Sequence, residues 1–214
     1  MVKITFNRII IILFLLLTIT ADSISQTYYI LNQENSKMTI LGTSSLHDWE
    51  MEVGDIDFST TLLTDGKVIS GIQDTYFSCT TTSIVSDYKL MDKKTYEALK
   101  AEEFSNIEFR MINGKISLIT GNAFSGTATG YLSIAGQTKE VNVPFHGNLH
   151  NDGQLDMEGK VNLKMSEFDI DPPKAMAGTL KTGDEISIVY SLKLEKNNSG
   201  KQISETKAGG STVN

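Results

Sequence analysis

The stretch FSGTATGYLSIAGQTKEVNVPF, residues 124–145, decides the fold class of this 214-residue chain. Apolar or small side chains occupy every second position, and mostly polar side chains occupy the positions between them. A period of two predicts antiparallel strands with one dry and one wet face, because successive side chains of a strand point to opposite sides. The two predicted dry faces are Phe124, Gly126, Ala128, Gly130, Leu132 and Ile134, then Val141, Val143 and Phe145.

The same alternation recurs toward the C-terminus. It runs from Leu155 to Met165 and again from Ile186 to Leu194. Glycine-containing turn segments separate the predicted strands. Short strands at this spacing predict a β-sandwich or a closed β-barrel. The predicted turns are Asp65-Gly66, Asn113-Gly114, Ala135-Gly136, Asn151-Asp152-Gly153 and Thr182-Gly183-Asp184.

One segment departs from the period of two. Residues 87–103, DYKLMDKKTYEALKAEE, carry Tyr88, Met91, Thr95 and Leu99 at helical spacing, and Asp87 is available as the N-cap. The pattern predicts one short helix between strands. We expect this helix to plug one end of the sheet structure, and a recognition helix is the alternative.

The N-terminus predicts export. Lys3 and Arg8 form a short positive region, the apolar run 9–17 follows, and small residues lead to Ser25. This order is typical of a cleavable secretory signal. The apolar run is shorter than the roughly 20 residues that a spanning helix needs, although an uncleaved anchor stays open. We expect residues 1–25 to be removed, giving a periplasmic or secreted protein that begins at Gln26 and has no integral membrane span.

The charge balance excludes nucleic acid as a partner. The signal contains Lys3, Arg8 and Asp22, so its removal changes the formal net charge from −7 to −8. Such a surface repels phosphates, and no cluster of Lys and Arg offsets this repulsion. The chain therefore carries neither the charge nor the basic patch that nucleic-acid binding requires.

The predicted domain covers residues 26–196. Cys79 is the only cysteine, so an intramolecular disulfide is excluded and the hydrophobic core must hold the fold. Residues 197–214, NNSGKQISETKAGGSTVN, offer almost no apolar side chains for burial. They are predicted to form a disordered polar tail.

Small residues on a dry face indicate something other than ordinary core packing. Gly126, Ala128 and Gly130 stand where a sandwich core would favour Val or Ile. Glycine within a strand marks a bend or the close approach of another group. A barrel that holds a ligand uses such positions to make room. We therefore expect a continuous elongated cavity, which the substitution Gly130→Phe should fill.

Four segments in order resemble the YceI-like family of exported polyisoprenoid-binding proteins. The resemblance implies an all-β, eight-stranded antiparallel lipocalin-like barrel whose apolar bore holds a polyprenyl lipid or an isoprenoid quinone. The HDW form of the first motif and the polar tail depart from the family pattern, and these departures bear on the ligand more than on the fold. The segments are LGTSSLHDWEM (residues 41–51), YEALKAEEFSNIEF (96–109), GYLSIAGQTKEVNVPF (130–145) and SEFDIDPPKAMAGTLKTGDEISI (166–188).

Strand parity nominates the residues that line the bore. An isoprenoid repeat is a branched C5 unit without polar atoms, so its site needs a continuous apolar wall. The alternative is that the same residues simply fill a core. Trp49 is the only tryptophan, and we expect it inside near the mouth with its N–H directed at a polar neighbour. The nominated residues are Trp49, Met51, Phe58, Phe77, Ile107, Phe109, Phe124, Leu132, Phe145, Leu163 and Met165.

Polar candidates are few. His47 and Asp48 precede Trp49 and either hold a ligand headgroup or close a turn. Lys174 follows two prolines and either meets a polar ligand end or belongs to a rigid loop. His146 and His150 have no cysteine and no cluster of acidic ligands nearby, so no metal site is predicted. No cofactor is predicted apart from a bound isoprenoid lipid or quinone.

The motifs favour binding over catalysis. Ser, His and Asp lie close together in GTSSLHDW, but neighbours in an extended chain point to opposite faces and cannot form a relay. No nucleophile elbow or phosphate-binding glycine loop is present. The prediction is a non-enzymatic protein that stores or transports an apolar isoprenoid ligand. An accessory factor or enzyme acting on a periplasmic lipid or quinone, and a filled-barrel scaffold, are the alternatives, and the oligomeric state is left open, a homodimer included.

Overall fold

The computed structural model describes residues 24–66, 68–175 and 180–197, so most of the predicted signal and tail lies outside the described residues. Strands dominate the described part. They are β1 (Ile24–Leu31), β2 (Lys37–Ser44), β3 (Trp49–Val53), β4 (Ile56–Asp65), β5 (Val68–Thr80), β6 (Ile84–Val85), β7 (Asn106–Thr120), β8 (Ala123–Ile134), β9 (Gln137–Leu149), β10 (Leu155–Lys164), β11 (Lys174–Ala175) and β12 (Leu180–Lys196). The helices are α2 (Lys89–Ala98) and the 3₁₀ turns η1 (Gln33–Asn35), η2 (Thr81–Ser83) and η3 (Met165–Phe168).

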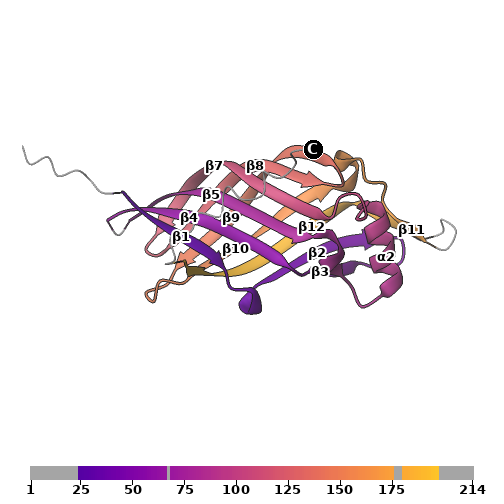
Figure 1. Cartoon of the computed structure of the whole chain (residues 1–214), viewed down its shortest axis with the longest axis horizontal. Helices are drawn as coiled ribbons and strands as arrows, with labels where there is room; N and C mark the ends of the chain where they lie inside the picture. Colours follow the sequence, from indigo (N-terminus) through magenta and orange to yellow (C-terminus); the bar gives the residue numbers. More distant parts are fainter. Residues whose placement is uncertain (1–23, 67, 176–179, 198–214) are drawn as a thin grey trace, which may run out of the picture.

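Eight strands form a closed antiparallel ring in the order β1, β4, β5, β7, β8, β9, β10 and β12. The ring closes where β12 pairs with β1, with Leu31 opposite Leu194. Closure leaves these strands without the free edges that an open sheet would expose. The eight-stranded antiparallel barrel predicted from the sequence is confirmed, and Figure 1 shows its long strands wrapping around one elongated interior.

Two positions of the ring are each formed by two consecutive strands with a break between them, β1 with β2 and β3 with β4. The C-terminal end of β12 pairs with β1, and the rest of β12 pairs with β2. Likewise β4 pairs with β1 and β3 pairs with β2. The breaks lie at η1 and at Gly54-Asp55, where Asp55 has a φ of +44°. Beyond the breaks the sheet runs from β12 through β2 and β3 to β6, and the chain then enters α2 (Figure 1).

The predicted alternation is confirmed. In β8 the side chains from Phe124 to Leu132 on the predicted dry face are buried, and Ile134 is half-buried. In β10 the buried positions run from Leu155 through Met157 and Val161. The period of two therefore assigns the inward face correctly in both strands, which settles their register relative to the barrel interior.

The interior is filled at the end away from α2, called here the closed end. Its large apolar side chains are at most 1 % exposed, so they are shielded from solvent. The hydroxyl groups of Thr60 and Thr75 are also buried there and hydrogen-bond to each other at 2.8 Å. The residues that fill the closed end are Tyr29, Leu62, Leu155, Leu192 and Leu194.

The predicted helix is present but shorter than residues 87–103. Asp87 is not its N-cap, because Tyr88 occupies that position and no side chain caps the helix. Instead, the Asp92 carboxylate accepts hydrogen bonds from the backbone N–H and the hydroxyl of Ser86, each at 2.7 Å. Lys100 has a φ of +52° and ends the helix, because this left-handed residue turns the chain away from the helix axis.

Two of the predicted turns are wrong. Asn113-Gly114 lies within β7, and Thr182-Gly183 lies within β12. A Cβ on Gly114 would approach the backbone oxygen of Ile72 to 2.7 Å, so this glycine allows two strands to pack closely. Both segments sit beside irregularities in strand pairing, where glycine serves a bulge rather than a turn.

Candidate functional site

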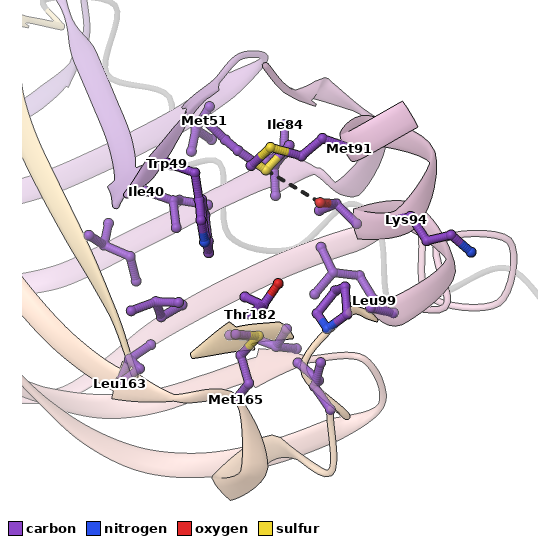
Figure 2. A pocket seen from close by; sticks show the side chains of 18 of the residues that line it. Ile40, Trp49, Met51, Ile84, Met91, Lys94, Leu99, Leu163, Met165 and Thr182 are labelled. Carbon is purple, nitrogen blue, oxygen red and sulfur yellow. Dashed lines mark hydrogen bonds between the residues drawn. The ribbon is translucent and has the colours of Figure 1, made fainter. Parts of the chain in front are cut away.

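An apolar cavity of about 500 Å³ lies at the end of the barrel that carries α2, called here the helix end. This volume falls within the range of small-molecule sites, which is about 300–1,000 Å³. Figure 2 shows Ile40, Trp49 and Met51 on one side of the cavity and Leu163 and Met165 on the other. The cavity is thus walled by side chains from both sides of the barrel.

Strands β2 and β3 supply one wall because their alternation directs every second side chain inward. Met51 is buried, and Trp49 is half-buried at the cavity edge. The indole lies over Gly42 of β2, where a Cβ would overlap the ring. The Trp49 Nε1–H donates to the backbone oxygen of Thr43 at 2.9 Å. The expected position of Trp49, inside near the mouth with a polar partner, is confirmed.

Helix α2 covers part of this end. Met91, Thr95 and Leu99, which were predicted to share a helix face, all line the cavity. Thr95 Oγ1 donates to Met51 Sδ at 3.3 Å, drawn as the dashed line in Figure 2. On the other side of the helix, the Tyr96 hydroxyl donates to the backbone oxygen of Thr82 at 2.9 Å. These bonds anchor the helix across the opening.

The mouth carries exposed apolar side chains. Tyr88 and Leu90 line the cavity, yet they are 69 % and 66 % exposed. Leu46, in the loop next to His47, is 71 % exposed. The apolar interior therefore continues outward onto the rim of the opening.

The predicted bore residues fall into two groups along the barrel. Seven of them line the large cavity: Trp49, Met51, Phe77, Ile107, Leu132, Leu163 and Met165. Phe58, Phe109 and Phe145 instead line a smaller cavity of about 100 Å³ deeper in the barrel. Phe124 is buried in the core and lines neither of these cavities. The interior therefore contains two cavities of unequal size, whereas the sequence analysis expects one continuous elongated cavity.

The glycines of β8 do not make room for a ligand. The ring of Phe109 lies over Gly130, and the ring of Phe145 lies over Gly126, each within 2.6 Å of where a Cβ would stand. The ring of Phe124 covers Gly147 of β9 in the same way. Phenyl rings from neighbouring strands thus occupy the space that the glycines leave. Gly130→Phe is therefore expected to disrupt the barrel rather than fill a cavity.

Two of the three proposed headgroup residues reach the large cavity. His47 and Lys174 line it, and both are exposed at its mouth. Asp48 is exposed and lines a separate polar hollow beside Glu50. Two further basic side chains, Lys94 of α2 and Lys164 of β10, also line the cavity. Lys94 Nζ lies 2.8 Å from Glu97 Oε2 and Lys164 Nζ lies 3.8 Å from Glu185 Oε1, so each of these lysines has a carboxylate partner.

The nominated set missed lining residues that lie outside the regular strands, on strands not considered, or on the predicted strand that begins at Ile186. The helical spacing of residues 88–99 already contained the signal for the α2 contribution, since one face of that helix had to meet the interior. The lining by η3 and its following loop carried no such periodic signal. Lining residues that were not nominated include Met38, Ile40, Ile84, Met91, Ala98, Phe168, Ile170 and Ile186.

The single cysteine belongs to the cavity wall. Cys79 is 3 % exposed, and burial raises the pKa of its thiol to about 12. The thiol therefore stays protonated at neutral pH and behaves as a small apolar side chain, because the thiolate is the reactive form.

The histidines of β9 and its following turn do not converge. His146 is exposed on β9, and the His150 Nε2 lies 2.9 Å from Asp156 Oδ2. Within residues 24–66, 68–175 and 180–197, no group of three or more His, Cys, Asp or Glu side chains is arranged to hold a metal ion. Over the same residues, no helix combines the length and apolar character needed to cross a bilayer.

Structures with this fold are known. BcnA of Burkholderia cenocepacia aligns with a TM-score of 0.59 and 17% identity, covering 76% of this chain and 98% of BcnA. A polyisoprenoid-binding domain from Saccharophagus degradans, implicated in plant cell wall breakdown, aligns with a TM-score of 0.60 and 8% identity, covering 79% of this chain and 98% of that domain. The YceI protein of Campylobacter jejuni aligns with a TM-score of 0.52 and 16% identity, covering 69% of this chain and 84% of that protein.

Sequence comparison identifies the family directly. A search of curated proteins finds no match to the chain. The sequence profile of the YceI-like domain, however, matches residues 29–194, from β1 to the last residues of β12. The match therefore includes all the strands of the ring. The chain belongs to the YceI-like domain family.

Proposed function

We propose that this protein is an exported carrier or store that encloses an isoprenoid chain, the tail of a polyprenyl lipid or of a quinone. The observation that carries the proposal is the 500 Å³ cavity, whose wall is almost wholly apolar. Among the described residues, no buried side-chain nitrogen or oxygen lacks a hydrogen-bond partner. The interior thus offers a ligand dispersion and hydrophobic contact, which suits a hydrocarbon chain.

Methionines make this wall adaptable. Met51, Met91 and Met165 line the cavity, and the unbranched thioether side chain adjusts to irregular shapes. A branched and unsaturated isoprenoid chain presents such an irregular surface. The similarity to a domain described as polyisoprenoid-binding supports the same ligand class.

The two alternative functions, a filled-barrel scaffold and an enzyme or accessory factor, would require a different interior. A filled scaffold needs no internal space, so the large cavity favours binding over that alternative. An enzyme or accessory factor acting on a lipid or quinone would place reactive groups beside the ligand. The polar groups at the mouth, His47 and Lys174, are suited to contact a headgroup, and turnover of the bound lipid would distinguish an enzyme from a carrier.

Organic extraction of the purified native protein, followed by mass spectrometry, is expected to release about one isoprenoid molecule per chain. Because Trp49 lines the cavity, removing the lipid should shift its fluorescence as water replaces hydrocarbon around the indole. Adding an isoprenoid quinone should then quench the emission. An extract without lipid, together with a spectrum that no isoprenoid changes, would show that the cavity serves another purpose.

Export is the second part of the proposal, and the order of charge and apolar residues in 1–25 supports it. N-terminal sequencing of the native protein is expected to begin at Gln26. Such cleavage would remove Ile24 and Ser25 from β1 and leave the pairing of Gln26 to Ile30 with β4 in place. A soluble native protein that retains Met1 would contradict the proposed route.

A further inference from the structure

The two internal cavities meet at a narrow set of side chains, called here the waist. Met38, Phe77, Leu132, Leu163 and Ile188 line both the 500 Å³ cavity and the 100 Å³ cavity. They come from five strands, β2, β5, β8, β10 and β12, so the waist encircles the interior. Access from the mouth to the deeper barrel must pass between these side chains.

The barrel beyond the waist resists widening. The ring of Phe109 lies on Gly130, and the ring of Phe145 lies on Gly126. Phe145 also meets Phe124 edge to face, with ring centroids 6.1 Å apart. Because each ring rests on backbone, it has no free space on that side into which it could rotate. Beyond the waist these rings therefore leave only the cavity of about 100 Å³, and the fully buried residues of the closed end lie past it.

The space in front of the waist has a different character. It is bounded by α2, by the methionines and by an open mouth, all of which tolerate a range of ligand shapes. With about 30 Å³ for each heavy atom, the share of one water molecule in the liquid, 500 Å³ holds roughly 17 atoms. The 100 Å³ cavity adds room for roughly three more.

We propose that the waist makes this barrel selective for the length of the isoprenoid chain. The cavity encloses about three or four C5 units, and the rest of a longer chain extends through the mouth without contributing to affinity. This inference rests on the proposed function and adds the chain length that the site recognises. Phe77, which is half-buried and lines both cavities, is the main specificity-determining residue of the waist.

The test is a titration of the lipid-free protein with prenols of increasing length, followed through Trp49 fluorescence. Affinity is expected to rise at least about tenfold for each C5 unit from C10 to C20, because each unit transfers five further carbons from water at up to about 0.8 kcal/mol each, less the cost of ordering the chain. From C20 to C45 it should change by less than about threefold, because the added units extend through the mouth and stay in water. A continued rise of tenfold or more beyond C20 would overturn the length limit while leaving the proposed function intact. Absence of binding at every length would overturn both.

Two variants test whether the waist sets the length of isoprenoid chain that contributes to affinity. Phe77→Ala removes the waist ring and joins the two cavities, so the length at which affinity levels off should increase by about one C5 unit. Phe104→Ala is the matched control, because Phe104 packs against Gly136 and lines neither cavity. An unchanged length profile in Phe77→Ala, or the same shift in Phe104→Ala, would show that the waist does not set the limit. The wild-type titration decides the question even if the variant is too unstable to purify.

Discussion

Gly130→Ala is expected to lower the free energy of unfolding by about 3 kcal/mol, although the change adds only one methyl group. The new Cβ would overlap the backbone oxygen of Arg110 in the neighbouring strand and would stand 2.6 Å from the ring of Phe109. Neither neighbour can retreat, because the first is backbone and the second is buried in the core. Urea denaturation followed by circular dichroism measures the change.

Gly71→Ala is the matched control for this substitution. Gly71 is also buried within a strand, but the nearest atom to an added Cβ is Leu63 Cδ1 at 3.3 Å, the mobile end of a side chain. The control should alter stability by less than about 1 kcal/mol, because alanine also restricts the unfolded chain. If both variants unfold at the wild-type urea concentration, the close contact between glycine and phenyl ring is not an essential feature of the barrel.

Ala98→Phe is expected to weaken ligand binding by at least about tenfold while the barrel stays folded. Ala98 lies on α2 and lines the large cavity, so a phenyl group there occupies space that the ligand needs. Burial of each methylene contributes about 0.8 kcal/mol, so displacing only two such groups of the ligand accounts for a tenfold loss. The amount of lipid that co-purifies and the quinone titration of Trp49 fluorescence measure the effect.

Ala101→Phe adds the same ring outside the cavity. Ala101 follows the helix and lines an outer groove with Tyr96 and Lys100. Binding by this control should match the wild type. Retention of full lipid binding by Ala98→Phe would place the ligand away from the helix end of the barrel.

The sequence predicted the elements that depend on neighbouring residues. The alternation of Phe124 to Ile134 gave the strand and its inward face, because side-chain direction in a strand follows the position number alone. The spacing of Met91, Thr95 and Leu99 likewise gave the helix face that meets the cavity. The four family-like segments gave the closed eight-stranded ring and so resolved the choice between sandwich and barrel.

Predictions failed where the outcome depends on residues distant in the chain, or on a side chain other than the one expected. Gly130 suggested an open interior, but Phe109 of the neighbouring strand fills the space beside it. Asn113-Gly114 suggested a turn, whereas close contact with Ile72 is what requires glycine there. Asp87 suggested an N-cap, but Asp92 forms the bonds that hold the start of the helix.

The sequence by itself thus determined that the chain forms strands with an apolar inward face, since this follows from a local period of two. The tertiary structure alone decided how the interior is divided between cavity and core. The reason is physical: a ring such as Phe145 fills the place beside Gly126 only because strand pairing brings β8 and β9 together. Free volume is a property of such cross-strand neighbours, so the cavity ends at Phe77 and its companions of the waist, where no local pattern marks a boundary.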